Sequence, residues 1–460
     1  MKHIRLIPVL LAALPLVSVC NAQQAASASV PAPEAVPDTS KLVVNTIDPK
    51  DGDTVVFLGD SITHQCLYTQ YVEDYFYTRY PKARIHFHNS GVGGDRAKDA
   101  LVRFDEDVAV YKPKYVTILL GMNDGTYTDF QKPVFDTYQK DMNTVLDRIA
   151  ELGAVAVPMT PTMHDARSRR LYGKPAEPRD TYYNGVLALY GAWLQEQAEV
   201  RGLGFVDMYS PLNSITLEQR TKDPKWTMIK DAVHPGPTGQ VVMAAAILND
   251  MVAKTPVSSI RVHEKDGRTV ATSRKGIVSD FAKDGEKVSF TFVAESLPWV
   301  LPAEAAEGMK LTNGARRFSN EKLTVNALKP GKYDVKIDGQ PIGTFTEEQL
   351  EAGVELEANE KTPQYQQALK VSTLNQQRND QAYRPIRDQY GALKGKRREL
   401  RIATEANDPM LETKKAEFET WYTTMKAKVA DLQAKAKTFE DQIYTENQPK
   451  SHRYEIVPAS

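Results

Sequence analysis

Cysteine is scarce in this chain: two occur in 460 residues. So few cysteines exclude a disulfide-stapled scaffold and any cysteine-rich zinc or iron–sulfur site. The charge also lacks a dominant sign, because 58 lysines and arginines stand against 59 aspartates and glutamates. This balance gives no electrostatic reason to expect nucleic acid as a partner. Apart from the N-terminus, no apolar run is long enough to cross a membrane, so we expect no stable membrane insertion.

The N-terminus has the pattern of an export signal. Lys2 and Arg5 precede residues 6–19, an almost purely apolar run that is too short to span a bilayer comfortably. Cleavage after Ala22 would remove this signal peptide, 1–22, and leave an exported protein, periplasmic or extracellular. A membrane anchor and a lipidated Cys20 are the alternatives. The second is disfavoured because the residues before Cys20 lack the small side chain usual next to a lipidated cysteine.

The stretch after the signal peptide divides into a linker and an alternating region. Residues 23–40 are mostly Ala, Ser, Pro and Gln, a composition typical of a disordered linker. Residues 41–257 alternate between strand-like and helix-like segments. Strands are predicted at 54–61, 83–91, 115–124, 154–161 and 203–210, and helices at 67–79, 97–110, 134–152 and 182–201. Such alternation predicts a parallel sheet covered on both faces, with the ligand site beyond the carboxyl ends of the strands.

The second half of the chain has a different pattern. Residues 258–345 contain short β-type runs separated by turn signals such as Lys329-Pro330-Gly331, which predicts a small antiparallel β module. Residues 346–447 predict a long helical hairpin that turns near residues 403–408. The pattern in residues 448–460 predicts a last strand.

A heptad seam supports the second helix of this hairpin. Its apolar residues are spaced by four and three positions: Phe418, Tyr422, Met425, Val429, Leu432, Ala436, Phe439 and Ile443. A seam of this kind can join two chains, so a dimer through the hairpin is one alternative. An intramolecular hairpin explains the same pattern without a partner, and we prefer a monomer. The basic stretch 394–398 on the hairpin predicts a solvated helix face.

Three polar or glycine-rich motifs follow predicted strands. Ser61, in Gly-Asp-Ser-Ile-Thr, lies at a strand-to-helix turn, where free backbone N–H groups can hold an anion. Gly94 belongs to a glycine-rich turn that lets the backbone approach a ligand closely. Asn123 can donate a hydrogen bond from a strand end. Each motif also has a plain reading, as a helix cap, a tight turn and an Asx-turn respectively.

A fourth motif, Asp231-Ala-Val-His234-Pro235, offers a proton shuttle. Histidine is the commonest general base near neutral pH, and a carboxylate three residues earlier can orient its ring. Pro235 biases His234 toward an extended backbone and stiffens the loop.

Together and in this order, the four motifs resemble those of the SGNH (GDSL-type) hydrolase superfamily over residues 50–250. The resemblance implies a three-layer α/β/α, flavodoxin-like fold. It also implies that Ser61 is the nucleophile, His234 the general base and acid, and Asp231 its orienting partner. The oxyanion hole would comprise the backbone N–H groups of Ser61 and Gly94 and the side-chain amide of Asn123. This chemistry needs neither a metal nor a cofactor.

Further residues near these motifs are candidates for lining the substrate site: Asp60, His64, Asp95, Tyr127 and His164. The polar residues around 164–169 favour a sugar over a long acyl chain. We therefore expect an exported serine esterase that hydrolyses short O-acyl esters, above all O-acetyl esters, on a small-molecule or polysaccharide substrate. A lipid esterase or lysophospholipase is the first alternative, and a non-catalytic binding or scaffold protein is the second.

Overall fold

The computed structural model of the chain describes residues 44, 46–173, 175, 177, 179–326 and 328–459. The expected signal peptide, 1–22, and linker, 23–40, lie outside these residues. Everything described belongs to one compact unit, Ser40–Ser460. Within the described ranges, no helix combines the length and the apolar character needed to cross a membrane.

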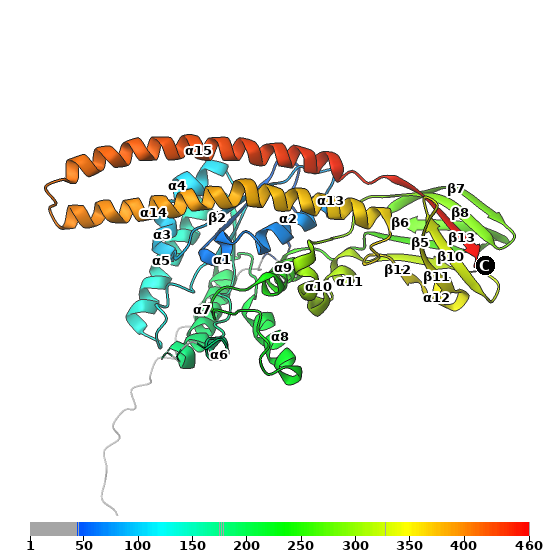
Figure 1. The fold of residues 1–460 in the computed structure, drawn as a ribbon, viewed down its shortest axis with the longest axis horizontal. Coiled ribbons are helices and arrows are strands. Elements are labelled where there is room, and N and C mark those ends of the chain that lie inside the picture. Colours follow the sequence, from blue (N-terminus) through cyan, green and yellow to red (C-terminus); the bar gives the residue numbers. More distant parts are fainter. Residues whose placement is uncertain are drawn as a thin grey trace, which may run out of the picture. The chain divides into compact units, whose positions relative to one another are not determined.

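A parallel sheet forms the centre of the first half of the chain (Figure 1). Its strands, in spatial order, are β2 (His86–Gly91), β1 (Thr54–Gly59), β3 (Tyr115–Leu119) and β4 (Val155–Pro158). Their side chains are buried at nearly every position, as expected for strands covered on both faces. Gly59 lies opposite both Gly91 and Leu119, so three strands end level with one another. Functional loops after these strands therefore begin close together.

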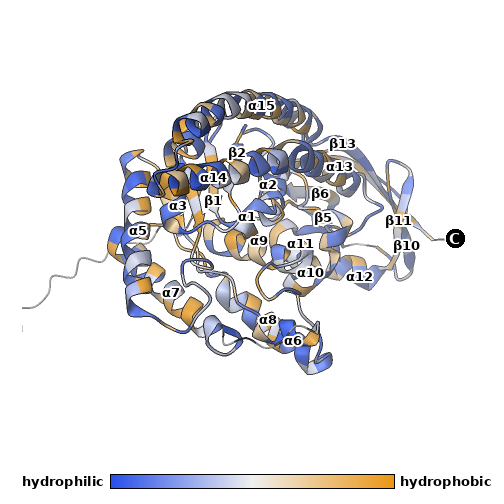
Figure 2. Cartoon of the chain, turned by 60° about the vertical axis from the view of Figure 1, so that its left-hand side comes forward, coloured by the Kyte–Doolittle hydropathy of each residue, from blue (hydrophilic) through white to orange (hydrophobic). Residues whose placement is uncertain are grey.

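Helices flank this sheet, and the predicted parallel α/β fold is confirmed. They are α1 (Ser61–His64), α2 (Tyr68–Arg79), α3 (Ala97–Val102), α4 (Phe104–Asp107), α5 (Lys132–Glu151), α6 (Ala166–Leu171), α7 (Arg179–Arg201), α8 (Tyr209–Lys222) and α9 (Pro237–Met251), with a 3₁₀ turn at Ala109–Tyr111. Helix α9 is buried around most of its circumference and is largely orange in Figure 2. It packs against α2, α8 and α10 (Ala306–Thr312).

Two expected elements differ from the structure. The predicted fifth strand, 203–210, forms only isolated parallel bridges, at Gly204 and Val206. Helix α8 begins instead at Tyr209, because Thr160 Oγ1 accepts the backbone N–H groups of Met208 and Tyr209. The predicted helix 97–110 is divided into α3, α4 and the 3₁₀ turn. Arg103 interrupts it with a non-helical backbone, where its guanidinium turns inward.

Two further sheets follow. One has the order β12 (Val354–Glu355), β9 (Glu321–Val325), β5 (Ser258–Lys265), β6 (Arg268–Arg274); the other has the order β11 (Gln340–Thr346), β10 (Lys332–Ile337), β13 (Ser451–Pro458), β8 (Lys287–Ala294), β7 (Gly276–Asp284). The expected final strand is thus the middle strand of its sheet.

The β module was expected to be wholly antiparallel, but it contains a parallel pair of strands. Strands β5 and β9 pair in parallel. A parallel pair needs a long crossover, and part of it here consists of α10 and α11 (Gly314–Ser319). A short helix, α12 (Glu347–Ala352), follows β11.

The helical region consists of α13 (Pro363–Arg378), a π-helical turn (Asn379–Tyr383), α14 (Arg384–Glu405) and α15 (Leu411–Glu446). The chain turns between α14 and α15, next to the predicted position, and α15 runs back along α14 and α13 (Figure 1). Four seam residues are buried against this same chain: Met425, Val429, Ala436 and Ile443. The division into domains and the monomeric state stay predictions.

A buried ion-pair cluster joins the hairpin to the region of the parallel sheet. Arg387 of α14 donates two hydrogen bonds to the Asp107 carboxylate of α4, at 2.6 and 2.8 Å. Arg103 donates a third, at 2.6 Å, and Ser90 Oγ donates a fourth, at 2.8 Å. Burial alone would raise the pKa of Asp107, but the two guanidiniums hold it well below its usual range. The carboxylate therefore stays charged between two buried cations.

Replacing Asp107 with alanine should destabilise the protein by about 3–5 kcal/mol, because the buried Arg387 loses its counter-ion and Arg103 keeps only Asp95. The urea dependence of unfolding measures this change. Asp136→Ala is the control, since Asp136 only pairs with Lys132 on an exposed helix face. A loss for Asp107→Ala no larger than that for Asp136→Ala would contradict the prediction.

Candidate active site

Three side chains from two distant parts of the chain form one hydrogen-bonded row. Nε2 of His234 lies 2.8 Å from Oγ of Ser61, and Nδ1 lies 2.7 Å from Oδ2 of Asp231. The other carboxylate oxygen accepts the backbone N–H groups of Val233 and His234, at 3.0 and 2.8 Å. The structure thus brings together all three residues that the motifs singled out.

The electrostatics of the row suit proton transfer. The hydrogen bond to Asp231 raises the pKa of His234 above its ordinary value of 6.5, against the lowering effect of partial burial. Partial burial would raise the pKa of Asp231, but the hydrogen bonds from His234 and the loop backbone hold it well below its usual range. The charged carboxylate keeps the proton on Nδ1 and leaves Nε2 free to accept one from Ser61. The side chains of His234 and Asp231 are 35% and 44% exposed, so the row is open to solvent.

Tight packing sets the turn that carries Ser61. A Cβ on Gly59 would lie 2.1 Å from Thr63 Oγ1, and a Cβ on Gly91 would lie 2.3 Å from the backbone nitrogen of His64, so only glycine fits at both. The N-cap of α1 is Asp60, whose carboxylate accepts the N–H of Ile62 at 2.9 Å. Ser61 is therefore the first helical residue rather than the cap, and its hydroxyl is left for His234.

The proposed oxyanion donors lie at the same edge of the sheet. Neither the N–H of Ser61 nor that of Gly94 bonds to another residue in the described part of the chain. Gly94 is exposed, in a turn with φ +69°. The amide of Asn123 donates to the Asp95 carbonyl at 3.0 Å and to Asp60 at 3.3 Å, and its oxygen accepts from Tyr127 at 3.1 Å. These contacts fix its orientation.

Three expected substrate-lining residues are instead buried. Asp60 is buried, and burial raises the pKa of its carboxyl to about 7. Asp95 is bound by Arg103 at 2.8 Å and Lys394 at 2.9 Å. His164 donates from Nδ1 to the Ala232 carbonyl at 3.0 Å, and burial lowers its pKa to about 4. These side chains hold neighbouring residues through buried contacts.

The other two candidates retain some exposure. His64 Nε2 lies 3.3 Å from Asp388 of α14, which turns this ring toward the hairpin. Tyr127 holds Asn123 and takes a left-handed backbone, with φ 58°. Such strain in a non-glycine residue is typical of functional sites.

The support of the histidine loop is a feature that no motif indicated. Ala232, between Asp231 and His234, has φ +76°. Its carbonyl accepts both His164 Nδ1 and the backbone N–H of Asp165, the latter at 2.9 Å. The Asp165 carboxylate is held in turn by Arg220, at 2.9 and 2.6 Å, and by Thr227. This bracing network spans nearly 70 residues of sequence, so no short motif could reveal it.

The site offers little support for a cysteine nucleophile or a metal centre. Cys66 is buried, and burial raises its pKa to about 12, so it is a poor nucleophile. Across the described ranges, no group of three or more His, Cys, Asp or Glu side chains is arranged to hold a metal ion.

Comparison with known proteins agrees with this geometry. Residues 57–242 match the GDSL-like lipase/acylhydrolase family, and this span contains the serine, glycine, asparagine and histidine motifs. This part of the chain belongs to that family. The protein is accordingly a carboxylic ester hydrolase of the SGNH type.

Individual proteins are also similar to this chain in sequence or structure. The chain is 25% identical to an acetylxylan esterase from Geobacillus stearothermophilus over 223 residues, 44% of this chain and 94% of that protein. It is 33% identical over 94 residues to an uncharacterized lipoprotein of Bacillus subtilis, 18% of this chain and 36% of that protein. A gut microbial diltiazem-metabolizing enzyme has a similar structure, with a TM-score of 0.78 and 27% identity over 90% of this chain and all of the other. That likeness therefore extends beyond the GDSL-type segment.

Proposed function

We propose that this GDSL-type hydrolase is an exported serine esterase that removes short O-acyl groups, above all O-acetyl, from carbohydrate. The observation that carries the proposal is the hydrogen-bonded row of Ser61, His234 and Asp231. A serine hydroxyl needs an adjacent base to become nucleophilic, and His234 is placed to be that base. Asp231 is placed to orient it.

The reaction follows from these positions. His234 takes the proton from Ser61 as Oγ attacks the ester carbonyl. The backbone N–H groups of Ser61 and Gly94 stabilise the oxyanion, together with the Asn123 amide, which exchanges its longer hydrogen bond, to Asp60, for one to the substrate. The intermediate collapses, and His234 gives the proton to the departing alcohol. Water, deprotonated by His234, then attacks the acyl-serine and releases the carboxylic acid.

The exposure of the hydrogen-bonded row and the similarity to a known esterase favour a short acyl group on a bulky alcohol. The side chains of His234 and Asp231 are open to solvent, which accommodates a large alcohol. Burying each CH₂ of an acyl chain adds about 0.8 kcal/mol to the free energy of binding, but a long chain gains this only where an apolar channel takes it up. The resemblance to an acetylxylan esterase supports acetyl and a sugar.

Export is part of the proposal and rests on the N-terminal pattern. Lys2, Arg5 and the apolar run that follows support a signal peptide. The likeness to a lipoprotein supports a location outside the cytoplasm.

Activity on p-nitrophenyl esters of increasing acyl length tests the substrate class. We expect kcat/KM to be highest for acetate and to fall by tenfold or more at octanoate, and we expect acetate release from acetylated xylooligosaccharide. A lipid esterase would gain about fourfold for each buried CH₂, so a rise toward octanoate would contradict the proposal.

A further inference from the structure

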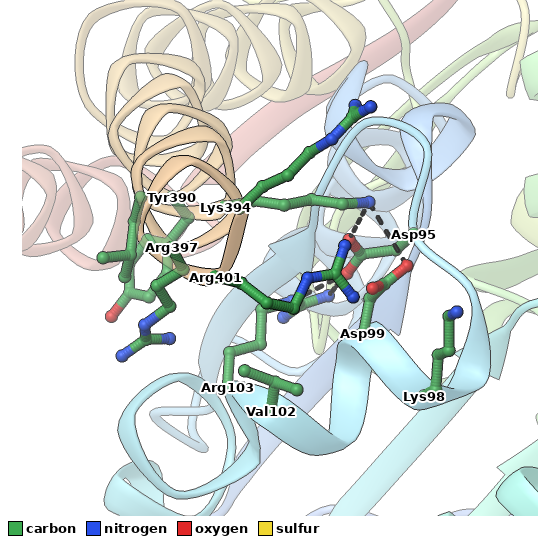
Figure 3. Close-up of a pocket in the computed structure, with 11 residues that line it drawn as sticks. Asp95, Lys98, Asp99, Val102, Arg103, Tyr390, Lys394, Arg397 and Arg401 are labelled. Atoms are coloured by element: carbon green, nitrogen blue, oxygen red, sulfur yellow. Dashed lines mark hydrogen bonds and ion pairs between the residues drawn. The ribbon is translucent and has the colours of Figure 1, made fainter. Parts of the chain in front are cut away.

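A pocket of about 310 Å³ lies between α3 and α14, outside the row of Ser61, His234 and Asp231. Figure 3 shows Lys394 and Arg401 reaching from α14 toward Asp95 and Asp99. The hairpin therefore supplies one wall of this pocket, and the hydrolase region supplies the other.

The lining of the pocket is strongly basic. Six cationic side chains face two carboxylates: Lys98, Arg103, Lys394, Arg397, Arg398 and Arg401 against Asp95 and Asp99. Three of these cations are already paired with carboxylates. Arg103 and Lys394 bind Asp95, and Arg397 binds Glu106 at 2.6 Å.

The remaining cations are left for a ligand. Lys98 and Arg398 are exposed and form no ion pair with any residue that the structure describes. Arg401 reaches only its helix neighbour Glu405, at 3.9 Å. A surface ion pair of this kind contributes little, so three positive charges stay available.

The pocket also has an apolar part. Tyr390 and Leu393 of α14 line it, together with Val102, which is 67% exposed. An exposed valine beside an aromatic ring and a row of cations offers both an apolar surface and charge-assisted hydrogen bonds. A sugar acid matches this combination, because it presents C–H faces and a carboxylate.

The pocket adjoins the proposed oxyanion turn. Asp95, which lines it, follows Gly94 directly, and its carbonyl accepts the Asn123 amide. Lys394 Nζ lies 3.4 Å from the Gly93 carbonyl and 3.8 Å from the place where a Cβ on Gly94 would be. A ligand in the pocket would therefore lie beside an ester bound at Ser61.

We propose that this pocket is a subsite for an acidic sugar of the substrate, whose carboxylate binds Arg398, Arg401 and Lys98. The esterase would then act on acylated glycans that contain uronic acids. The role of this subsite in ester hydrolysis rests on the proposed function, whereas ligand binding at the subsite is argued from the pocket alone. The basic stretch 394–398 is then a ligand-binding face and not merely a solvated one.

Calorimetric titration of the mature protein with trigalacturonate tests the subsite. The double variant Arg398→Gln/Arg401→Gln should weaken binding about tenfold, because two exposed charge pairs are lost. Glutamine keeps the helix, since its helix propensity is close to that of arginine. The matched control is Lys428→Gln/Lys435→Gln, which removes the same charge from exposed positions of α15 outside the pocket. The control should bind like the wild type.

Two further ligands show whether a calorimetric binding signal comes from the acidic sugar, from a neutral sugar or from charge alone. Xylotriose, which is neutral, should bind more weakly than trigalacturonate, and inorganic sulfate at equal ionic strength should not compete with it. Equal binding of xylotriose, full competition by sulfate, or an equal loss in both double variants would overturn the subsite. Hydrolysis of p-nitrophenyl acetate is measured on the same samples and should be unchanged in the Lys428→Gln/Lys435→Gln control. If that hydrolysis is absent in the wild type, the proposed esterase function fails while the titration still decides the subsite.

Discussion

Replacing Ser61 with alanine is expected to lower kcat for p-nitrophenyl acetate by about 10⁶-fold. Among the residues that the structure describes, the Ser61 hydroxyl is the nucleophile placed on His234, at 2.8 Å. The nearby thiol of Cys66 cannot replace it, because it is buried and its pKa is raised to about 12. The rate of p-nitrophenol release at saturating substrate measures the loss.

Ser214→Ala is the matched control for this prediction. Ser214 lies on an exposed face of α8, where its hydroxyl contacts only a backbone carbonyl at 3.3 Å. Its replacement should leave kcat unchanged. If Ser61→Ala kept more than about one hundredth of the activity, Ser61 would not be the nucleophile.

Asp231→Asn is expected to lower kcat by roughly 10⁴-fold while leaving the fold intact. Asparagine retains the oxygen that accepts the backbone N–H groups of Val233 and His234. Its amide would donate to Nδ1 of His234 and so leave the proton on Nε2. That tautomer cannot accept the proton of Ser61.

The pH profile separates this effect from a loss of structure. In the wild type, kcat/KM should fall as the pH falls through the pKa of His234, which lies above 6.5, because protonated histidine is no base. Without the Asp231 carboxylate this pKa decreases, so the acid limb of the variant should move to lower pH. An acid limb that stays in place would show that Asp231 does not act on His234.

The structure also explains why some predictions from sequence were right and others were not. Strands β1 and β3 were recognisable because each is a short, mostly apolar run, and the largely polar strand β2 was recognisable because it runs into a glycine-rich turn. The predicted strand 203–210 was also apolar, but a helix begins there because Thr160, 48 residues before Met208, accepts the backbone N–H of Met208, while Asp207 accepts that of Ser210. Tertiary hydrogen bonds outweighed local propensity.

The candidate site shows the same division. Ser61 and His234 were identified because their motifs are local and each follows a predictable strand or loop. The burial of Asp95 and His164 was not predictable, since it depends on Arg103, Lys394 and Ala232, which come from other elements. A single sequence carries no signal for such pairs.

The sequence by itself determined the reaction class of this protein and the elements that carry it. Those follow from short motifs and from the rule that parallel strands end at one edge of the sheet. Only the tertiary structure decided what surrounds the site. Arg387 meets Asp107 across 280 residues, and the same helix brings its basic face against the turn that holds Gly94. Such contacts arise from how whole elements pack together, and that packing leaves no local pattern in the chain.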